Sequence, residues 1–193
     1  QEIIDDVKKN GGQAILTSKN PKTGTDRIYE AINKIENQDI ELVMNLQGDE
    51  PLMDIDDIRN LYNHMVRTKS KMGTLASKIS NKDFYEKESV VKVITHEELN
   101  FNKFILASNF TRKSKKDNKN TYHHLGIYCY QIDVLKNFVS LHQTESEIKN
   151  RLEQLRALDN QIEINVGLAH SSPVGVDTVE DFVAIKKIME YKS

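Results

Sequence analysis

In the stretch ELVMNLQGDEP, residues 41–51, an apolar strand pattern is followed by a glycine, two adjacent carboxylates and a proline. Its apolar first half predicts a buried strand over 41–47, which the following glycine and proline end. The adjacent carboxylates of Asp49 and Glu50 need solvent, a cation or a hydrogen-bonding partner there. Because ligands bind beyond the carboxyl ends of strands in open α/β sheets, the stretch indicates a Mg²⁺ or substrate site. A solvated turn is the plainer alternative, and spacing alone leaves both readings open.

Strand-like and helix-like segments alternate along the whole chain. The apolar patterns predict strands over residues 13–18, 41–47, 72–80, 90–95, 103–110, 124–130 and 162–168. They predict helices over residues 1–10, 25–36, 54–69, 145–158 and 178–190. This order is typical of an α/β domain with a mainly parallel sheet. The closely spaced strands between 72 and 110 indicate a mixed or antiparallel annex.

The composition is that of one soluble domain of 193 residues. A net charge of −2 and a pI near 6.3 argue against a general nucleic-acid binder. No run approaches the ~18 apolar residues of a membrane span, and the charged first residues do not form a signal peptide. Cys129 is the only cysteine, so an internal disulfide is impossible and a cytoplasmic location is expected.

Five stretches, in a fixed order, carry a family pattern. They are KTGTDRIYEAI at 22–32, VMNLQGDEP at 43–51, HHLGIYCY at 123–130, LEQLRAL at 152–158 and GVDTVEDF at 175–182. Each one is weak evidence by itself, but together they extend over nearly the whole chain. In this order they resemble the 3-deoxy-manno-octulosonate cytidylyltransferases, which are also called CMP-KDO synthetases.

The resemblance implies a fold, an activity and partners. The fold is a Rossmann-like nucleotidyltransferase fold, with helices on both faces of the sheet, in a single domain over residues 1–193. The activity is transfer of CMP from CTP to 3-deoxy-D-manno-octulosonate with release of pyrophosphate, for lipopolysaccharide biosynthesis. Mg²⁺ is the implied cofactor and a homodimer the implied assembly, without nucleic acid or membrane insertion.

The resemblance also implies roles for single residues. Asp49 and Asp177 are the expected metal ligands, and Arg27 joins them as a catalytic residue. The residues expected to face the sugar acid are His124, Tyr128, Glu153 and Gln154. Those expected near the nucleotide or the sugar are Thr25 and Gln47.

The chemistry suits these residue types, although each has a plainer reading. Two distant carboxylates can hold Mg²⁺ at a phosphate, and the guanidinium fork of Arg27 suits phosphate or carboxylate. His124 and Tyr128 are four apart on a strand and so share a face. However, Asp177 followed by Thr178 is also an ordinary helix start. A zinc site is not indicated, because the paired Cys/His spacing is absent.

Two departures from the family pattern bear on activity. The family opens with a strand and a loop resembling PARxxSxRLPGKxL, which holds the triphosphate, and the chain has no such segment. We therefore expect an N-terminally incomplete domain. Asn109 stands where an arginine is expected, and Arg112 is the candidate replacement. A related sugar-acid nucleotidyltransferase and a non-catalytic nucleotide-binding remnant are the alternatives.

Overall fold

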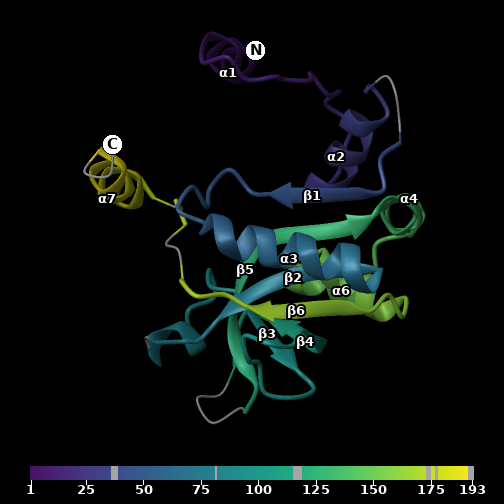
Figure 1. Ribbon diagram of the computed structural model, residues 1–193, viewed down its shortest axis with the longest axis vertical. Coiled ribbons are helices and arrows are strands. Elements are labelled where there is room, and N and C mark those ends of the chain that lie inside the picture. Colours follow the sequence, from purple (N-terminus) through teal and green to yellow (C-terminus); the bar gives the residue numbers. More distant parts are fainter. Residues whose placement is uncertain (36–38, 81, 115–118, 173–174, 177, 191–193) are drawn as a thin grey trace.

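A mixed sheet with helices around it forms the centre of the protein (Figure 1). The computed structural model describes residues 1–35, 39–80, 82–114, 119–172, 175–176 and 178–190. In this part of the chain the strands are β1 (Leu42–Leu46), β2 (Met72–Ser77), β3 (Lys92–Thr95), β4 (Ile105–Thr111), β5 (Thr121–Gln131) and β6 (Ile164–Leu168). The helices are α1 (Glu2–Lys9), α2 (Gly24–Ile32), α3 (Ile55–Thr68), α4 (Ile132–Ser140), α5 (Glu145–Asn150), α6 (Gln154–Asp159), α7 (Val179–Glu190) and the 3₁₀ helix η1 (Lys82–Tyr85).

Strand β5 organises the sheet. The strand order is β1-β5-β2-β6-β4-β3, and β5 also pairs with β3. The eleven-residue β5 runs antiparallel to β1, β2 and β3, whereas β2 and β6 pair in parallel. The α/β class and the mixed sheet are confirmed, but the parallel share is smaller than the sequence predicted. Apolar periodicity locates strands but does not give their directions. Here the long strand β5 runs antiparallel to three neighbours, which lowers the parallel share.

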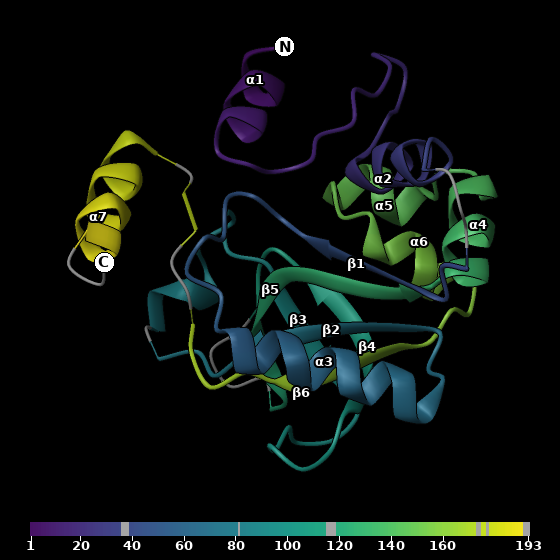
Figure 2. The same cartoon turned by 45° about the horizontal axis from the view of Figure 1, so that its top comes forward.

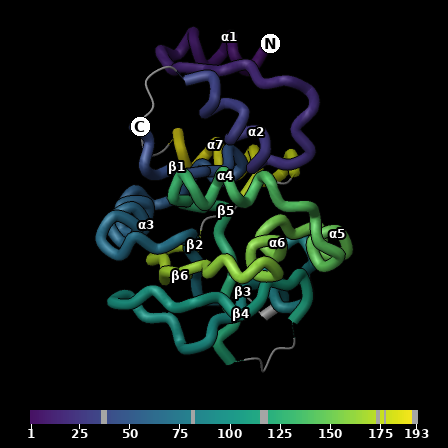
Figure 3. The backbone as a smooth tube through the Cα atoms, turned by 90° about the vertical axis from the view of Figure 1, so that its right-hand side faces the viewer, coloured from purple at the N-terminus to yellow at the C-terminus, as the bar shows by residue number. Residues whose placement is uncertain are grey.

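Alternating side chains of the strands bury two apolar clusters, one on each face of the sheet. In β2, Met72 and Ala76 enter the larger cluster with side chains of α4 and α6. Leu75, between them, enters the smaller cluster with Leu61 and Met65 of α3. This is the period of two that a strand with both faces buried requires. Figure 3 shows α3 on one side of the sheet and α6 on the other, so the expectation of helices on both faces is confirmed.

Three elements differ from the sequence prediction. Residues 13–18 form no strand, and the segment joins α1 to α2 outside the sheet (Figure 2). The helix predicted over 145–158 is two helices, because Arg151 ends α5 in the left-handed conformation with φ 53°. Helix α4 was not predicted, since it follows β5 directly with no glycine or proline between them. Within the described residues, no helix combines the length and apolar character that a membrane span needs.

Candidate active site

The predicted site residues converge on one cleft of about 520 Å³. Its walls come from the end of β1, from β5, from the N-terminal turns of α2 and α6, and from the segment between η1 and β3. Seven predicted residues line it: Thr25, Gln47, Asp49, His124, Tyr128, Glu153 and Gln154. Arg27 is not among the lining residues, and Asp177 lies outside the residues that the structure describes.

The two adjacent carboxylates after β1 have different surroundings. Glu50 Oε1 accepts a hydrogen bond from the backbone N–H of Gly126 in β5 at 2.7 Å. Asp49 is exposed and lines the cleft. Its backbone oxygen accepts from the N–H of Val176, the residue before the predicted second ligand, at 2.8 Å. Glu50 also lines the cleft, but one of its oxygens supports the strand end, so Asp49 is the more exposed of the two carboxylates.

Glu50 offers a test of this support. We expect Glu50→Ala to destabilise the protein by about 1–3 kcal/mol, because it deprives the Gly126 N–H of its acceptor. Urea unfolding followed by circular dichroism measures the loss. Glu41→Ala is the matched control, since Glu41 is exposed and only ion-pairs with Lys69. Equal stability of the two variants would contradict this role for Glu50.

A bulge in β5 lies between His124 and Tyr128, two residues expected to face the sugar acid. Thr74 of β2 pairs with Tyr128 of β5, and Ala76 of β2 pairs with His124 of β5. Two residues along β2 therefore correspond to four residues along β5. Residues four apart in a regular strand lie roughly 13 Å apart. Here the rings of His124 and Tyr128 have centroids 5.2 Å apart. The prediction that they share a face holds, and the bulge adds a proximity that the sequence did not indicate.

Both residues are buried and uncharged. Burial lowers the pKa of His124 to about 3, with a smaller contribution from the neighbouring His123. Burial likewise raises the pKa of Tyr128 well above its usual value. At neutral pH this wall of the cleft therefore presents a neutral imidazole and a neutral phenol, which suit hydroxyl groups better than phosphate.

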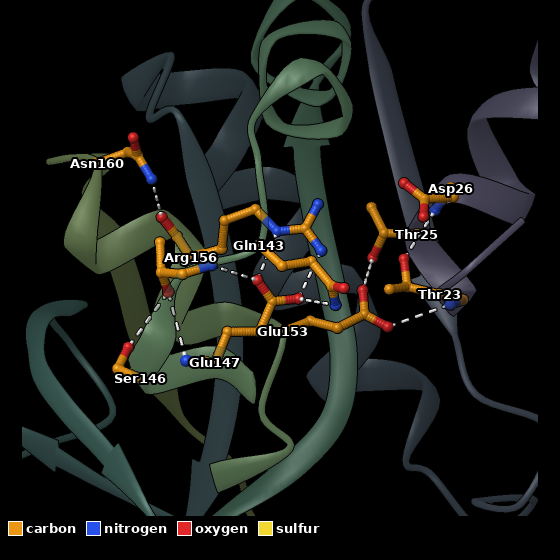
Figure 4. A network of polar contacts seen from close by, with 11 residues as sticks. Thr23, Thr25, Asp26, Gln143, Ser146, Glu147, Glu153, Arg156 and Asn160 are labelled. Carbon is orange, nitrogen blue, oxygen red and sulfur yellow. Dashed lines mark hydrogen bonds and ion pairs between the residues drawn. The ribbon is translucent and has the colours of Figure 1, made fainter. Parts of the chain in front are cut away.

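Glu153 joins α6 to α2, as Figure 4 shows. Its Oε1 accepts from the backbone N–H of Gly24 at 3.1 Å, and its Oε2 from the hydroxyl of Thr25 at 2.7 Å. A carboxylate is favourable at a helix N-terminus, where backbone N–H groups lack partners within the helix. Glu153 thus lines the cleft as predicted, but both of its oxygens are already hydrogen-bonded to the first turn of α2.

A buried ion pair lies behind this wall (Figure 4). Arg156 donates to Glu147 Oε2 from Nε at 2.8 Å and to Oε1 from Nη2 at 2.5 Å. Both side chains are at most 3% exposed, and the guanidinium carbon is 4.6 Å from the ring centroid of Phe138. The pair fixes α5 against α6 and so positions Gln154 on the cleft. Glu147 was missed, although TESE at 144–147 is a capping-box signature, and the structure confirms that box.

Arg27 and Asn109 both have hydrogen-bond partners away from the cleft. Arg27 Nη1 donates to Thr17 Oγ1 at 2.5 Å and to the backbone oxygen of Ser18 at 3.1 Å. It therefore holds the segment before α2, and the geometry gives no support to its expected catalytic role. Asn109 Oδ1 accepts from the N–H of Phe110 and does not line the cleft.

Arg112 lines the cleft and braces its wall. Its three nitrogens donate to the backbone oxygens of Glu88, Asn150 and Arg151 at 2.9–3.0 Å. The buried Lys92 donates to the backbone oxygens of Arg112, Lys87 and Val90, and burial lowers its pKa to about 8. A lysine inside the apolar run VVKVIT was the sequence signal for this brace. Three of its five N–H groups thus brace the wall, and the role of Arg112 as the replacement for the missing arginine stays a prediction.

Comparisons with known proteins show the family of the chain. The sequence model described as cytidylyltransferase matches residues 1–164. The chain belongs to the cytidylyltransferase family. Its relatives include the 3-deoxy-manno-octulosonate cytidylyltransferases of Thermodesulfovibrio yellowstonii strain YP87, at 38% identity, and Paramagnetospirillum magneticum strain AMB-1, at 33%. The matches cover 97% and 98% of this chain and 77% of each relative.

Solved structures confirm the cytidylyltransferase fold. The CMP:2-keto-3-deoxy-manno-octonic acid synthetase complexed with CTP superposes with a TM-score of 0.84 at 30% identity, over 100% of this chain and 78% of that one. A UDP-glucose pyrophosphorylase complexed with UDP-glucose has a TM-score of 0.67 at 12% identity, over 100% of this chain and 74% of that one. The second likeness shows the nucleotidyltransferase fold alone.

Proposed function

We propose that this cytidylyltransferase transfers CMP from CTP to 3-deoxy-D-manno-octulosonate and releases pyrophosphate. The observation that carries the proposal is the family relationship. Two relatives of that activity are 38% and 33% identical to this chain over 97% and 98% of its length. The cleft supports it, since it gathers seven of the residues that the family pattern assigns to metal, nucleotide and sugar acid.

The reaction needs positioning and charge neutralisation. The anomeric hydroxyl oxygen loses its proton to solvent and bonds to the α-phosphorus of CTP. The bond from that phosphorus to the oxygen bridging it to the β-phosphate breaks, and pyrophosphate leaves with that oxygen. The wall of His124 and Tyr128 binds and orients the hydroxylated sugar. Gln47 and Thr25, which the family pattern puts near the nucleotide or the sugar, lie at the end of β1 and the start of α2. Asp49 lines the same cleft.

Mg²⁺ is the proposed cofactor. Mg²⁺ is commonly held by one or two carboxylates together with substrate phosphates, and Asp49 is an exposed carboxylate on the cleft. The neighbouring Glu50 is committed to Gly126, so the donor set fits one protein ligand here, with Asp177 as the second by the family pattern. When bound, the ion neutralises phosphate charge. We also propose a homodimer, a cytoplasmic location and a role in lipopolysaccharide biosynthesis, on the family resemblance.

The deciding experiment is pyrophosphate release from CTP and Mg²⁺, with and without the octulosonate. The chain is assayed by itself and joined behind the opening segment of the Thermodesulfovibrio yellowstonii relative. Release that requires the sugar acid and yields CMP-octulosonate is the expected result. An active fusion that instead prefers another sugar acid would favour the second candidate function, a related sugar-acid nucleotidyltransferase. That candidate is favoured by Asn109, which stands where the family pattern has an arginine, whereas Arg112 already donates to three backbone oxygens.

His124 tests the sugar-acid wall. We expect His124→Ala to raise the KM for the octulosonate roughly tenfold, as for loss of one hydrogen bond, and to leave the KM for CTP nearly unchanged. His142→Ala is the control, because His142 is exposed and is not among the residues lining this cleft. Steady-state kinetics with each substrate varied measures the split. A change in the KM for CTP alone would show that His124 does not bind the sugar acid.

A further inference from the structure

Thr74 is a fully buried residue of β2 that lies beside the β5 bulge. Its hydroxyl oxygen is 2.6 Å from the backbone oxygen of Ile127 and 3.0 Å from Nε2 of His124. Thr74 does not itself line the cleft, and neither the family pattern nor the proposed function gives it a role. Its two contacts nevertheless determine which nitrogen of His124 carries a proton.

The assignment follows from counting protons. A backbone oxygen can only accept, so the single hydroxyl proton of Thr74 is directed to Ile127. The hydroxyl oxygen must then accept from His124, which requires a proton on Nε2. A neutral imidazole carries one N–H, and burial keeps this ring neutral by lowering its pKa to about 3. Nδ1 of His124 is therefore a hydrogen-bond acceptor.

We propose that Thr74 is a positioning residue that holds His124 in the Nε2–H tautomer, so that Nδ1 accepts a hydroxyl of the sugar acid and disfavours its carboxylate. The inference rests on the proposed function and deepens it. A carboxylate offers only acceptor oxygens at neutral pH, so it gains no hydrogen bond from an acceptor nitrogen. A hydroxyl group does gain one. The wall that contains His124 thus binds the hydroxylated part of the sugar acid, and the carboxylate of the sugar acid binds elsewhere in the cleft.

The first test is independent of turnover. The ¹⁵N chemical shifts of the imidazole nitrogens are measured at pH 7 in the substrate-free protein, and the His124 signals are assigned by their loss in His124→Gln. We expect a protonated Nε2 and an unprotonated Nδ1. A proton on Nδ1, or on both nitrogens, would overturn the proposal even if the enzyme transfers CMP.

The second test is kinetic. Thr74→Val removes the hydroxyl at nearly constant volume, and the lost hydrogen bond is expected to raise the KM for the octulosonate roughly tenfold, with the KM for CTP within about twofold. Thr74→Ser keeps the hydroxyl and is expected to restore the KM. Thr95→Val is the matched control, because Thr95 is a buried strand threonine whose hydroxyl donates only to backbone oxygens, those of Glu97 and Asn120.

A double variant separates positioning from general damage. In the His124→Ala background, Thr74→Val is expected to change the KM for the sugar acid no further, because the ring that it orients is gone. A full tenfold effect in that background, or an equal rise in the KM for CTP, would overturn the proposal. Absence of any sugar-acid turnover in the wild type would instead refute the proposed function, while the chemical-shift test would still decide the tautomer.

Discussion

The Asp49→Asn variant is expected to transfer CMP roughly 1,000-fold more slowly than the wild type while keeping its fold. The side chain is exposed on the cleft, and asparagine keeps its size, so little packing changes. The lost charge is the one proposed to hold Mg²⁺ at the phosphates, where metal ions contribute several kcal/mol. Initial rates of pyrophosphate release across a Mg²⁺ titration measure the effect.

Asp56→Asn is the matched control for this variant. Asp56 is an exposed aspartate in the first turn of α3 and forms an ion pair with Arg59 at 2.9 Å. Exposed pairs of this kind contribute about 0–1 kcal/mol, so activity is expected to stay near that of the wild type. If Asp49→Asn turned over as fast as Asp56→Asn at every Mg²⁺ concentration, Asp49 would not be a metal ligand.

The Glu147→Ala variant is expected to be destabilised by about 3–5 kcal/mol, because it leaves the buried guanidinium of Arg156 without its partner. Urea unfolding measures the change. Glu145→Ala, an exposed glutamate of the same helix, is the matched control and is expected to change stability by at most about 0.5 kcal/mol. Replacing both partners, as in Glu147→Leu with Arg156→Met, is expected to recover most of the loss. A double variant as unstable as Glu147→Ala would contradict the pair as the cause.

The same pair predicts a pH dependence. Burial by itself raises the pKa of Glu147, but hydrogen bonds from Arg156 and Gln143 outweigh it, and the net pKa lies below the ordinary value of 4.5. A lowered folded-state pKa means that the stabilisation is present above pH 4.5 and is lost as the pH falls through the folded-state value. The acid limb of the stability profile is therefore expected to be steeper in the wild type than in Glu147→Gln.

The sequence by itself determined the family, most of the helices and strands, and most of the residues that line the cleft. Apolar spacing located β1, β2, β5 and α3, since the period of a strand or helix is a local property of the chain. The ordered motifs identified seven residues that the fold brings into one cleft. The helix predicted over 54–69 is α3, and the Asp54 side chain caps its start by accepting from the N–H of Asp56.

Only the tertiary structure decided how those residues are used. Asp49 and Glu50 are adjacent carboxylates that both line the cleft, but only the structure shows that Glu50 accepts from Gly126 of β5 while Asp49 is exposed. Arg112 was a candidate ligand, and three of its five N–H groups donate to backbone oxygens from two distant segments. The tautomer of His124 depends on Thr74, fifty residues away. Strand register and helix packing decide which groups meet as hydrogen-bond partners, and local sequence patterns do not encode either. The sequence therefore shows which residues are charged or polar, but not which groups they bond to.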